Sequence, residues 1–282
     1  MPYVTTRASR FKRVVSDKSL LFTERDFSIL YALYKYHLLT THQITQSYPG
    51  SEQRTRWRLR ELFDAGYVHR FNTKTDATIP GSENNARRTL ATIPHALMVS
   101  DIMLRVELAC YYTPDQVAFI GQREILNSAP ERTRMRRSPT HWNSPVILRG
   151  ETEKIGNNPD QIFAILDKLR PEGRNKAYFF LEADRGTESV RPDSAHVNKA
   201  TIYKKLLGYY HTHMHKLHSE VFGEGMRNFR VLWIIDSNKR DRNGKTRLQN
   251  FLDTAKEVTE GHLPELFLFT TYEAFRAKQP FE

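Results

Sequence analysis

The chain is 282 residues long and strongly basic, with a formal net charge of +11 at pH 7 and a pI of about 9.7. Its single cysteine, Cys110, excludes a disulfide framework and any zinc site built from cysteines. No apolar run approaches the roughly 18–20 residues that a membrane span needs, so we expect a cytoplasmic protein with no membrane partner. The excess of lysine and arginine favours a polyanionic partner, because these side chains displace counterions from phosphates.

The N-terminal third begins with an arm and continues with helices. Residues 1–19 are basic and lack an apolar stretch, so we interpret them as a flexible arm. A first helix is predicted after Thr23, which forms a capping-box variant with Asp26. A short second helix is predicted over THQITQSY. A third is predicted from Ser51, its N-cap, to Ala65, with a glycine following where helices commonly end.

The third helix carries the strongest indication of nucleic-acid binding. At the helical period, one face collects Thr55, Leu59, Leu62 and Phe63, which we expect to pack inward. The other side carries three arginines and a tryptophan, Arg54, Trp57, Arg58 and Arg60, and a fourth arginine, Arg56, lies at its edge. The planar fork of arginine suits phosphates and guanine edges. The alternative is an ordinary amphipathic helix with a solvated basic face.

Two strands are predicted after the third helix, at residues 67–71 and 87–93, separated by a polar loop at 72–86. Three helices followed by a hairpin are the pattern of a winged helix, in which the third helix enters the major groove and the loop is the wing. We therefore predict a winged-helix DNA-binding domain at residues 20–92, with double-stranded DNA as its partner.

The remaining residues, 93–282, alternate between helices and strands. A long apolar helix is expected over PHALMVSDIMLRVELACYY and further helices over 196–218 and TRLQNFLDTAKEV. Strands are expected at VAFIG, QIFAIL, AYFFLEAD, FRVLWIID and ELFLFT. This order predicts an α/β domain with a mixed central sheet, and so an α+β or α/β protein overall.

One segment of this region, ERTRMRRSPTHWNSP, is predicted to be a basic loop. It carries Arg132, Arg134, Arg136, Arg137 and the aromatic Trp142. A basic loop with an aromatic side chain can follow a nucleic-acid backbone and stack on a base. A solvated surface loop is the alternative.

Three acids stand at the ends of predicted strands. Asp160 precedes QIFAIL, whereas Glu182 and Asp184 end AYFFLEAD and share one face of it, because side chains alternate along a strand. If a turn at 170–175 joins these strands as an antiparallel pair, Asp160 lies beside Glu182. Converging carboxylates can hold Mg²⁺ for phosphodiester cleavage. The alternative is a structural strand end, with Arg185 or Lys199 between the acids.

Four histidines in HTHMHKLH, at positions 211, 213, 215 and 218, raise the question of a second metal site. Helical histidines four residues apart can bind zinc. The HExxH pattern of metalloproteases is absent, and a solvated helix end is the favoured interpretation.

The acids also carry a family resemblance. PD at 159–160 and ExD at 182–184 resemble the PD-(D/E)xK motif of the restriction-endonuclease-like superfamily. The resemblance implies that Asp160 and Glu182 bind Mg²⁺ and that a helix glutamate, matched here by Glu107, joins them. It also implies that residues 93–282 adopt the nuclease-like fold.

The match departs from the superfamily pattern at the lysine that helps to activate water. Asp184 stands at that position in this sequence. Some members carry the lysine on the following helix, where Lys199 and Lys204 are candidates. The catalytic set implied is therefore Asp160, Glu182, Asp184 and Lys199.

The combination is similar to a narrower group, the replication-relaxation family of plasmids and other mobile elements. The resemblance rests on TERDFSILYAL, RTRWRLRELFDAGYVHR, PDQIFAIL and YFFLEADRGTES, and covers residues from about 20 to 270. It implies a DNA-binding accessory role in replication or DNA relaxation, with other replication or transfer proteins, or a second copy of the chain, as further partners. A metal-dependent endonuclease or nickase and a transcription regulator with an inactive nuclease-like domain are the alternatives.

Overall fold

The computed structural model describes residues 20–48, 50–69, 92–148, 150–191, 201–236, 239–261 and 265–277. The chain divides into two compact units, residues 1–104 and 105–282. The division falls within helix α5 (Ile93–Tyr112), and the boundary expected between residues 92 and 93 lies at the start of this helix.

The N-terminal unit contains the three predicted helices, α1 (Glu24–Tyr36), α2 (Thr41–Ser47) and α3 (Glu52–Asp64). Each begins at a side chain that accepts a hydrogen bond from the first turn: Thr23, Thr40 and Ser51. Such caps satisfy backbone N–H groups that have no partner within the helix. Helices α2 and α3 follow each other in the chain and pack together, which is a helix–turn–helix arrangement.

The predicted wing falls mostly outside the described residues. Tyr67–His69 are described and do not form a strand, whereas residues 70–91, which contain the rest of the hairpin, are not described. The winged form of this domain therefore stays a prediction.

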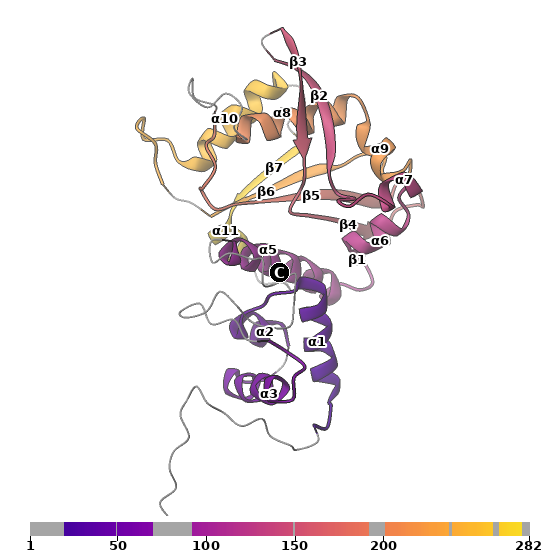
Figure 1. The fold of residues 1–282 in the computed structure, drawn as a ribbon, viewed down its shortest axis with the longest axis vertical. Coiled ribbons are helices and arrows are strands. Elements are labelled where there is room, and N and C mark those ends of the chain that lie inside the picture. The colour runs from indigo at the N-terminus through magenta and orange to yellow at the C-terminus, as the bar shows by residue number, and fades with distance from the viewer. Residues whose placement is uncertain are drawn as a thin grey trace, which may run out of the picture. The chain divides into compact units, whose positions relative to one another are not determined.

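The C-terminal unit is built on a five-stranded mixed sheet in the order β1-β4-β5-β6-β7 (Figure 1). These strands are β1 (Val117–Ile120), β4 (Gln161–Asp167), β5 (Lys176–Asp184), β6 (Arg230–Ile235) and β7 (Phe267–Thr271). Strand β4 pairs antiparallel with β1 and β5, and β6 pairs parallel with β5 and β7. The mixed central sheet predicted from the sequence is confirmed, and the protein is of the α+β class.

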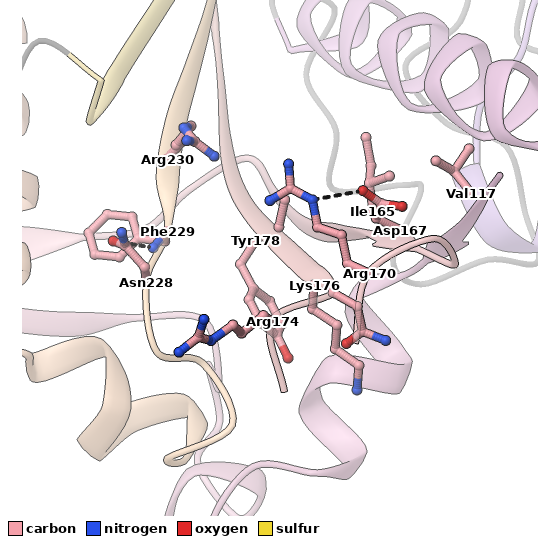
Figure 2. Close-up of a pocket in the computed structure, with 12 residues that line it drawn as sticks. Val117, Ile165, Asp167, Arg170, Arg174, Lys176, Tyr178, Asn228, Phe229 and Arg230 are labelled. Carbon is pink, nitrogen blue, oxygen red and sulfur yellow. Dashed lines mark hydrogen bonds and ion pairs between the residues drawn. The ribbon is translucent and has the colours of Figure 1, made fainter. Parts of the chain in front are cut away.

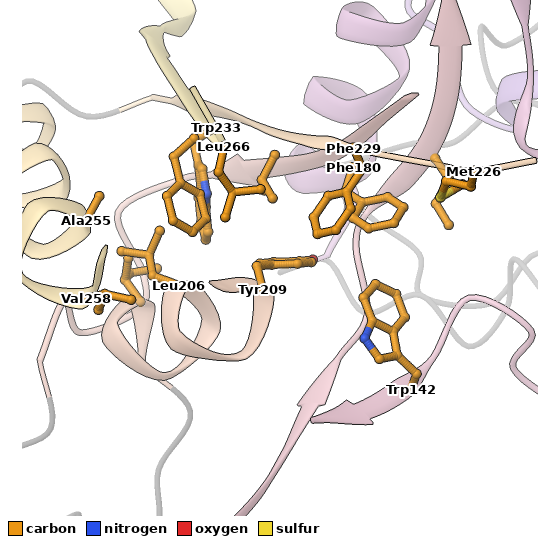
Figure 3. Packing of buried hydrophobic residues seen from close by; sticks show 14 of the residues in the cluster. Trp142, Phe180, Leu206, Tyr209, Met226, Phe229, Trp233, Ala255, Val258 and Leu266 are labelled. Carbon is orange, nitrogen blue, oxygen red and sulfur yellow. The ribbon is translucent and has the colours of Figure 1, made fainter. Parts of the chain in front are cut away.

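The helices of this unit are α6 (Gln122–Asn127), α7 (Glu131–Arg134), α8 (Ile202–Met214), α9 (Leu217–Phe222), α10 (Arg247–Thr259) and α11 (Tyr272–Ala277). Helices α8 and α10 pack against each other and cover one face of the sheet (Figure 1). Between them and the strands lies a buried cluster that includes Phe180, Tyr209 and Trp233 (Figure 3). Burial of large aromatic side chains like these is a main source of stability.

A second, two-stranded sheet was not predicted. Strands β2 (Trp142–Leu148) and β3 (Glu151–Asn157) form an antiparallel hairpin that packs on α8. The buried Trp142 Nε1 donates to Thr212 Oγ1 over 2.8 Å, and Ser144 Oγ donates to the Gly208 carbonyl over 3.0 Å. A Cβ at Gly208 would lie 2.5 Å from Asn157 Oδ1, so the close approach of hairpin and helix requires glycine there.

The structure overturns two predictions made for the C-terminal unit. The expected basic loop is instead helix α7, a short turn and the start of β2, and Trp142 is buried rather than available for stacking on a base. The single helix predicted over 196–218 is interrupted where Lys216 adopts a left-handed conformation, so α8 ends and α9 begins there. Within the described part of the chain, none of the helices combines the length and apolar character needed to cross a membrane.

Candidate functional site

The exposed side of α3 carries most of the residues predicted to contact DNA. Arg54, Arg56, Trp57 and Arg60 are exposed, whereas Thr55 and Leu62 are buried, as expected for the inner face. Trp57 is 53% exposed, against 3% for Trp142 and 1% for Trp233, so it is the most accessible of the three tryptophans. Arg56 pairs with Glu52 one turn earlier, and such exposed pairs contribute little to stability.

Two residues of α3 lie elsewhere than predicted. Arg58 is not on the free surface: its Nε and Nη2 donate to the two carboxylate oxygens of the buried Asp26, over 2.7 and 2.6 Å. Its Nη1 also donates to Glu61 over 2.7 Å. Phe63, expected inside, is 46% exposed. Compared with the predicted helix orientation, the buried face of α3 therefore includes Arg58 and leaves out Phe63. Arg58 holds α3 against α1 and is not available to contact DNA.

In the C-terminal unit, Asp160 and Glu182 are brought together as predicted. Gln161 pairs with Leu181 in the antiparallel register of β4 and β5, which sets the preceding Asp160 opposite Glu182. The Asp160 backbone N–H donates to the Leu181 carbonyl over 2.9 Å, and the Ala183 N–H donates to Asp160 Oδ2 over 2.7 Å. These two hydrogen bonds, at the end of the β4–β5 pair opposite its turn, hold Asp160 beside Glu182.

Glu182 is buried among polar partners from α8. Tyr209 Oη donates to its Oε1 over 2.5 Å, and Lys205 Nζ lies 3.3 Å from its Oε2. Burial raises the pKa of Glu182 to about 7 and outweighs the lowering by Lys205, while the nearby charge of Asp160 adds to the rise. Burial alone lowers the pKa of Lys205, but the negative charges of Glu182 and Glu188 outweigh it and the net shift is upward.

The carboxylate of Asp184 is paired with an arginine. Nε and Nη2 of Arg247, at the start of α10, donate to its two carboxylate oxygens over 2.5 and 2.6 Å. The Gly186 backbone N–H adds a bond of 3.2 Å to Asp184 Oδ2. Among the described residues, Lys205 therefore pairs with Glu182 and Arg247 with Asp184, whereas the structural alternative with Arg185 or Lys199 between the acids stays untested.

The candidate lysines differ in their placement. Lys199 lies outside the described residues. Lys204 turns toward the β2–β3 hairpin and pairs with Glu153. The lysine beside the acids is Lys205, which sequence reasoning missed. It stands four residues before Tyr209, so the two share a helix face, and that spacing was a signal available in the sequence.

The acids do not fit the metal-ligand set that the resemblance implies. Mg²⁺ takes several oxygen ligands in near-octahedral geometry. Among the described residues, no group of three or more His, Cys, Asp or Glu side chains is arranged to hold a metal ion. Glu107 lies half-buried on α5 near Cys110, and its charge helps burial to raise the pKa of that thiol. The structure does not join Glu107 to Asp160 and Glu182 as a third ligand.

The four histidines at positions 211, 213, 215 and 218 form two pairs. His211 and His215 stack with ring centroids 4.0 Å apart. His213 and His218 both contact Phe229, with centroids 5.8 and 4.9 Å from its ring. Burial lowers the pKa of His211, His213 and His218, so these rings are neutral near pH 7.

The fold and the acid-bearing strands define the class: an α+β protein whose mixed sheet carries paired acids at the end of an antiparallel hairpin. The chain matches the family model described as Replication-relaxation over residues 74–221. This match covers more than half of the chain, and the protein belongs to the Replication-relaxation family. The matched segment contains the acids, Lys205 and Tyr209 but not α3. The comparisons with curated proteins and with solved structures gave no match.

Proposed function

We propose that the protein is a DNA-binding accessory factor in the replication or relaxation of a plasmid or other mobile element, and that it docks on duplex DNA through α3. The observation that carries the proposal is the exposed basic face of α3, on which Arg56, Trp57 and Arg60 stand together. Membership of the Replication-relaxation family supports the biological setting.

The chemistry of this face suits a duplex. Arg56 and Arg60 are four residues apart and project from neighbouring turns of one side of the helix. Guanidinium groups bind phosphates in bidentate fashion and read guanine edges in the major groove. The net charge of +11 adds a sequence-independent attraction to DNA, which weakens as salt rises.

The support beneath this face is rigid. The Arg58–Asp26 pair joins α3 to α1. A second bond between these helices runs from Arg25 Nη2 on α1 to Thr55 Oγ1 on α3, over 2.5 Å. Ser51 caps the helix by accepting from the Arg54 N–H over 3.2 Å. A recognition helix held in this way presents its arginines without reordering on binding, which lowers the entropic cost of association.

A salt titration tests the proposal. In the full chain, R56Q/R60Q should weaken binding to a short duplex and reduce the slope of log K against log salt by about 0.9 for each phosphate that is no longer neutralised. The matched control K154Q/R242Q removes two exposed cations from the C-terminal unit and should behave nearly as wild type. Equal affinity and slope in R56Q/R60Q and the control would exclude α3 as the docking element.

Metal-dependent DNA cleavage is a second candidate, favoured by one observation. Lys205 reaches Glu182 from the helix that follows β5, as the lysine does in some PD-(D/E)xK members. Nicking of supercoiled plasmid with Mg²⁺ or Mn²⁺ that disappears in E182Q, together with a Mn²⁺-induced rise in melting temperature that disappears in Asp160→Ala, would support it. We expect neither effect, because Lys205 already pairs with Glu182 and Arg247 with Asp184.

A further inference from the structure

The other end of the same sheet carries a basic pocket that the proposed function does not use. The pocket has a volume of about 360 Å³ and lies where β4 ends, β5 begins and β6 begins (Figure 2). Its apolar lining includes Val117, Ile165 and Phe229. Four cationic side chains line it, Arg170, Arg174, Lys176 and Arg230, against a single acid, Asp167.

The positive charge in this pocket is only partly compensated. Arg170 Nε lies 3.0 Å from Asp167 Oδ2, and Arg230 Nη2 lies 3.8 Å from Glu265, whose side chain is 88% exposed. Within the described part of the chain, Arg174 and Lys176 make no side-chain ion pair or hydrogen bond that would hold them. Like charges gathered in this way repel each other, and a bound anion relieves that repulsion.

The polar groups that line the pocket are also of the kind that bind phosphate. The side chains of Asn175 and Asn228 add amide groups to the rim, and Tyr178 adds an aromatic ring with a phenol. Arginine and lysine donate charge-assisted hydrogen bonds to phosphate oxygens, and arginine does so through two parallel N–H groups. A lining that combines apolar side chains with a few polar groups is typical of ligand pockets.

We propose that this pocket binds a phosphate group, carried either by the DNA backbone or by a free nucleotide. Lys176 opens β5 and Glu182 lies near its end, so the pocket is separated from the acids by most of the length of that strand. It belongs to the C-terminal unit, whereas α3 belongs to the N-terminal unit. The inference therefore does not depend on DNA docking through α3.

The test uses the full chain, the variant R174Q/K176Q and the control K154Q/R242Q, which removes the same charge from exposed sites away from the pocket. Isothermal titration with ATP and with inorganic phosphate measures the free-ligand arm. Removal of each cation should weaken binding on the order of tenfold, as expected for hydrogen bonds between charged groups. The control should retain the wild-type affinity.

Salt titration of duplex binding provides the second arm. A slope lowered by about 0.9 per phosphate in R174Q/K176Q, but not in the control, assigns the phosphate to the DNA backbone. An unchanged slope with loss of ATP or phosphate binding assigns it to a free ligand. If R174Q/K176Q matches the control in both arms, the pocket does not bind phosphate. If R56Q/R60Q binds duplex DNA with the affinity and salt slope of wild type while R174Q/K176Q does not match its control, docking through α3 is rejected and the phosphate-binding pocket is not.

Discussion

A buried carboxylate lies beside a cation in each unit of the protein, Asp26 in the N-terminal unit and Glu182 in the C-terminal unit, and the pKa values of these two acids shift in opposite directions. In the N-terminal unit, the hydrogen bonds of Arg58 lower the pKa of Asp26 to about 2. In the C-terminal unit, burial raises the pKa of Glu182 to about 7 although Lys205 lies close by. A nearby opposite charge alone therefore does not decide whether a buried acid stays ionised.

The difference lies in the number and geometry of the donors. Asp26 receives two bonds from the Arg58 fork and two from Thr23, whose backbone N–H and hydroxyl both lie 2.7 Å from Oδ2. Glu182 accepts one hydrogen bond from the Tyr209 hydroxyl and one, over 3.3 Å, from Lys205 Nζ, which also donates to Glu188. Full hydrogen bonding of the charged form offsets desolvation at Asp26, whereas desolvation dominates at Glu182.

The largest effect should follow from breaking the pair in the N-terminal unit. R58M leaves Asp26 buried without its cation and should cost about 3–5 kcal/mol, as expected when one partner of a buried ion pair is removed. Hydrogen–deuterium exchange of peptides from α1 and α3 measures the loss in that unit. Adding D26N should restore on the order of half of it, because no unpaired charge is then buried.

In the control K154Q/R242Q the same peptides should exchange as in wild type. If R58M alone leaves the exchange unchanged, the pair does not stabilise the helices, and the explanation given for the low pKa of Asp26 fails.

The second prediction concerns the pH dependence of the C-terminal unit. Glu182 titrates near 4.5 when unfolded and near 7 when folded, so between these values the folded state holds the extra proton. Stability from this group is thus full below pH 4.5 and falls by about 3 kcal/mol as pH rises through 7. E182Q should remove this fall. Urea unfolding between pH 4 and 8 measures it, and parallel profiles for the two proteins would contradict the prediction.

The smallest effect should come from the phenol of Tyr209. Y209F removes the bond to Glu182 Oε1 and should cost about 1 kcal/mol above pH 7, where the carboxylate is ionised. The hydrogen bond lowers the pKa of Glu182, so its loss should move the midpoint of the pH profile upward. Urea unfolding between pH 4 and 8 measures both the loss of stability and the shift of the midpoint. In the E182Q background, Y209F should no longer change the pH dependence of stability.

Much of this comparison could be predicted from the sequence. Local signals were sufficient for the caps at Thr23 and Ser51, and for the antiparallel β4–β5 pair that sets Asp160 opposite Glu182. Caps and hairpins depend on residues close together in the chain, and the period of the apolar residues identified the strands.

The partners of the acids could not be predicted in the same way. Lys205, rather than Lys204, meets Glu182 because of the rotation of α8 on the sheet, and tertiary packing sets that rotation. Arg247 reaches Asp184 from a helix 63 residues further along the chain. Strand β2 was missed because its flanking arginines and Pro145 suggested a loop, and because the buried Ser144 and the exposed Ile147 hide the alternation of apolar and polar residues that predicts a strand.

The short turn between β4 and β5 also bears on the order of folding. Asp160 and Glu182 meet through a local hairpin, whereas Lys205 and Tyr209 arrive with α8, which follows in the chain. Local contacts close with less loss of chain entropy than distant ones, so we expect the hairpin to form first. During synthesis the two acids would then face each other before their counterion is in place, and mild acid should favour this early intermediate.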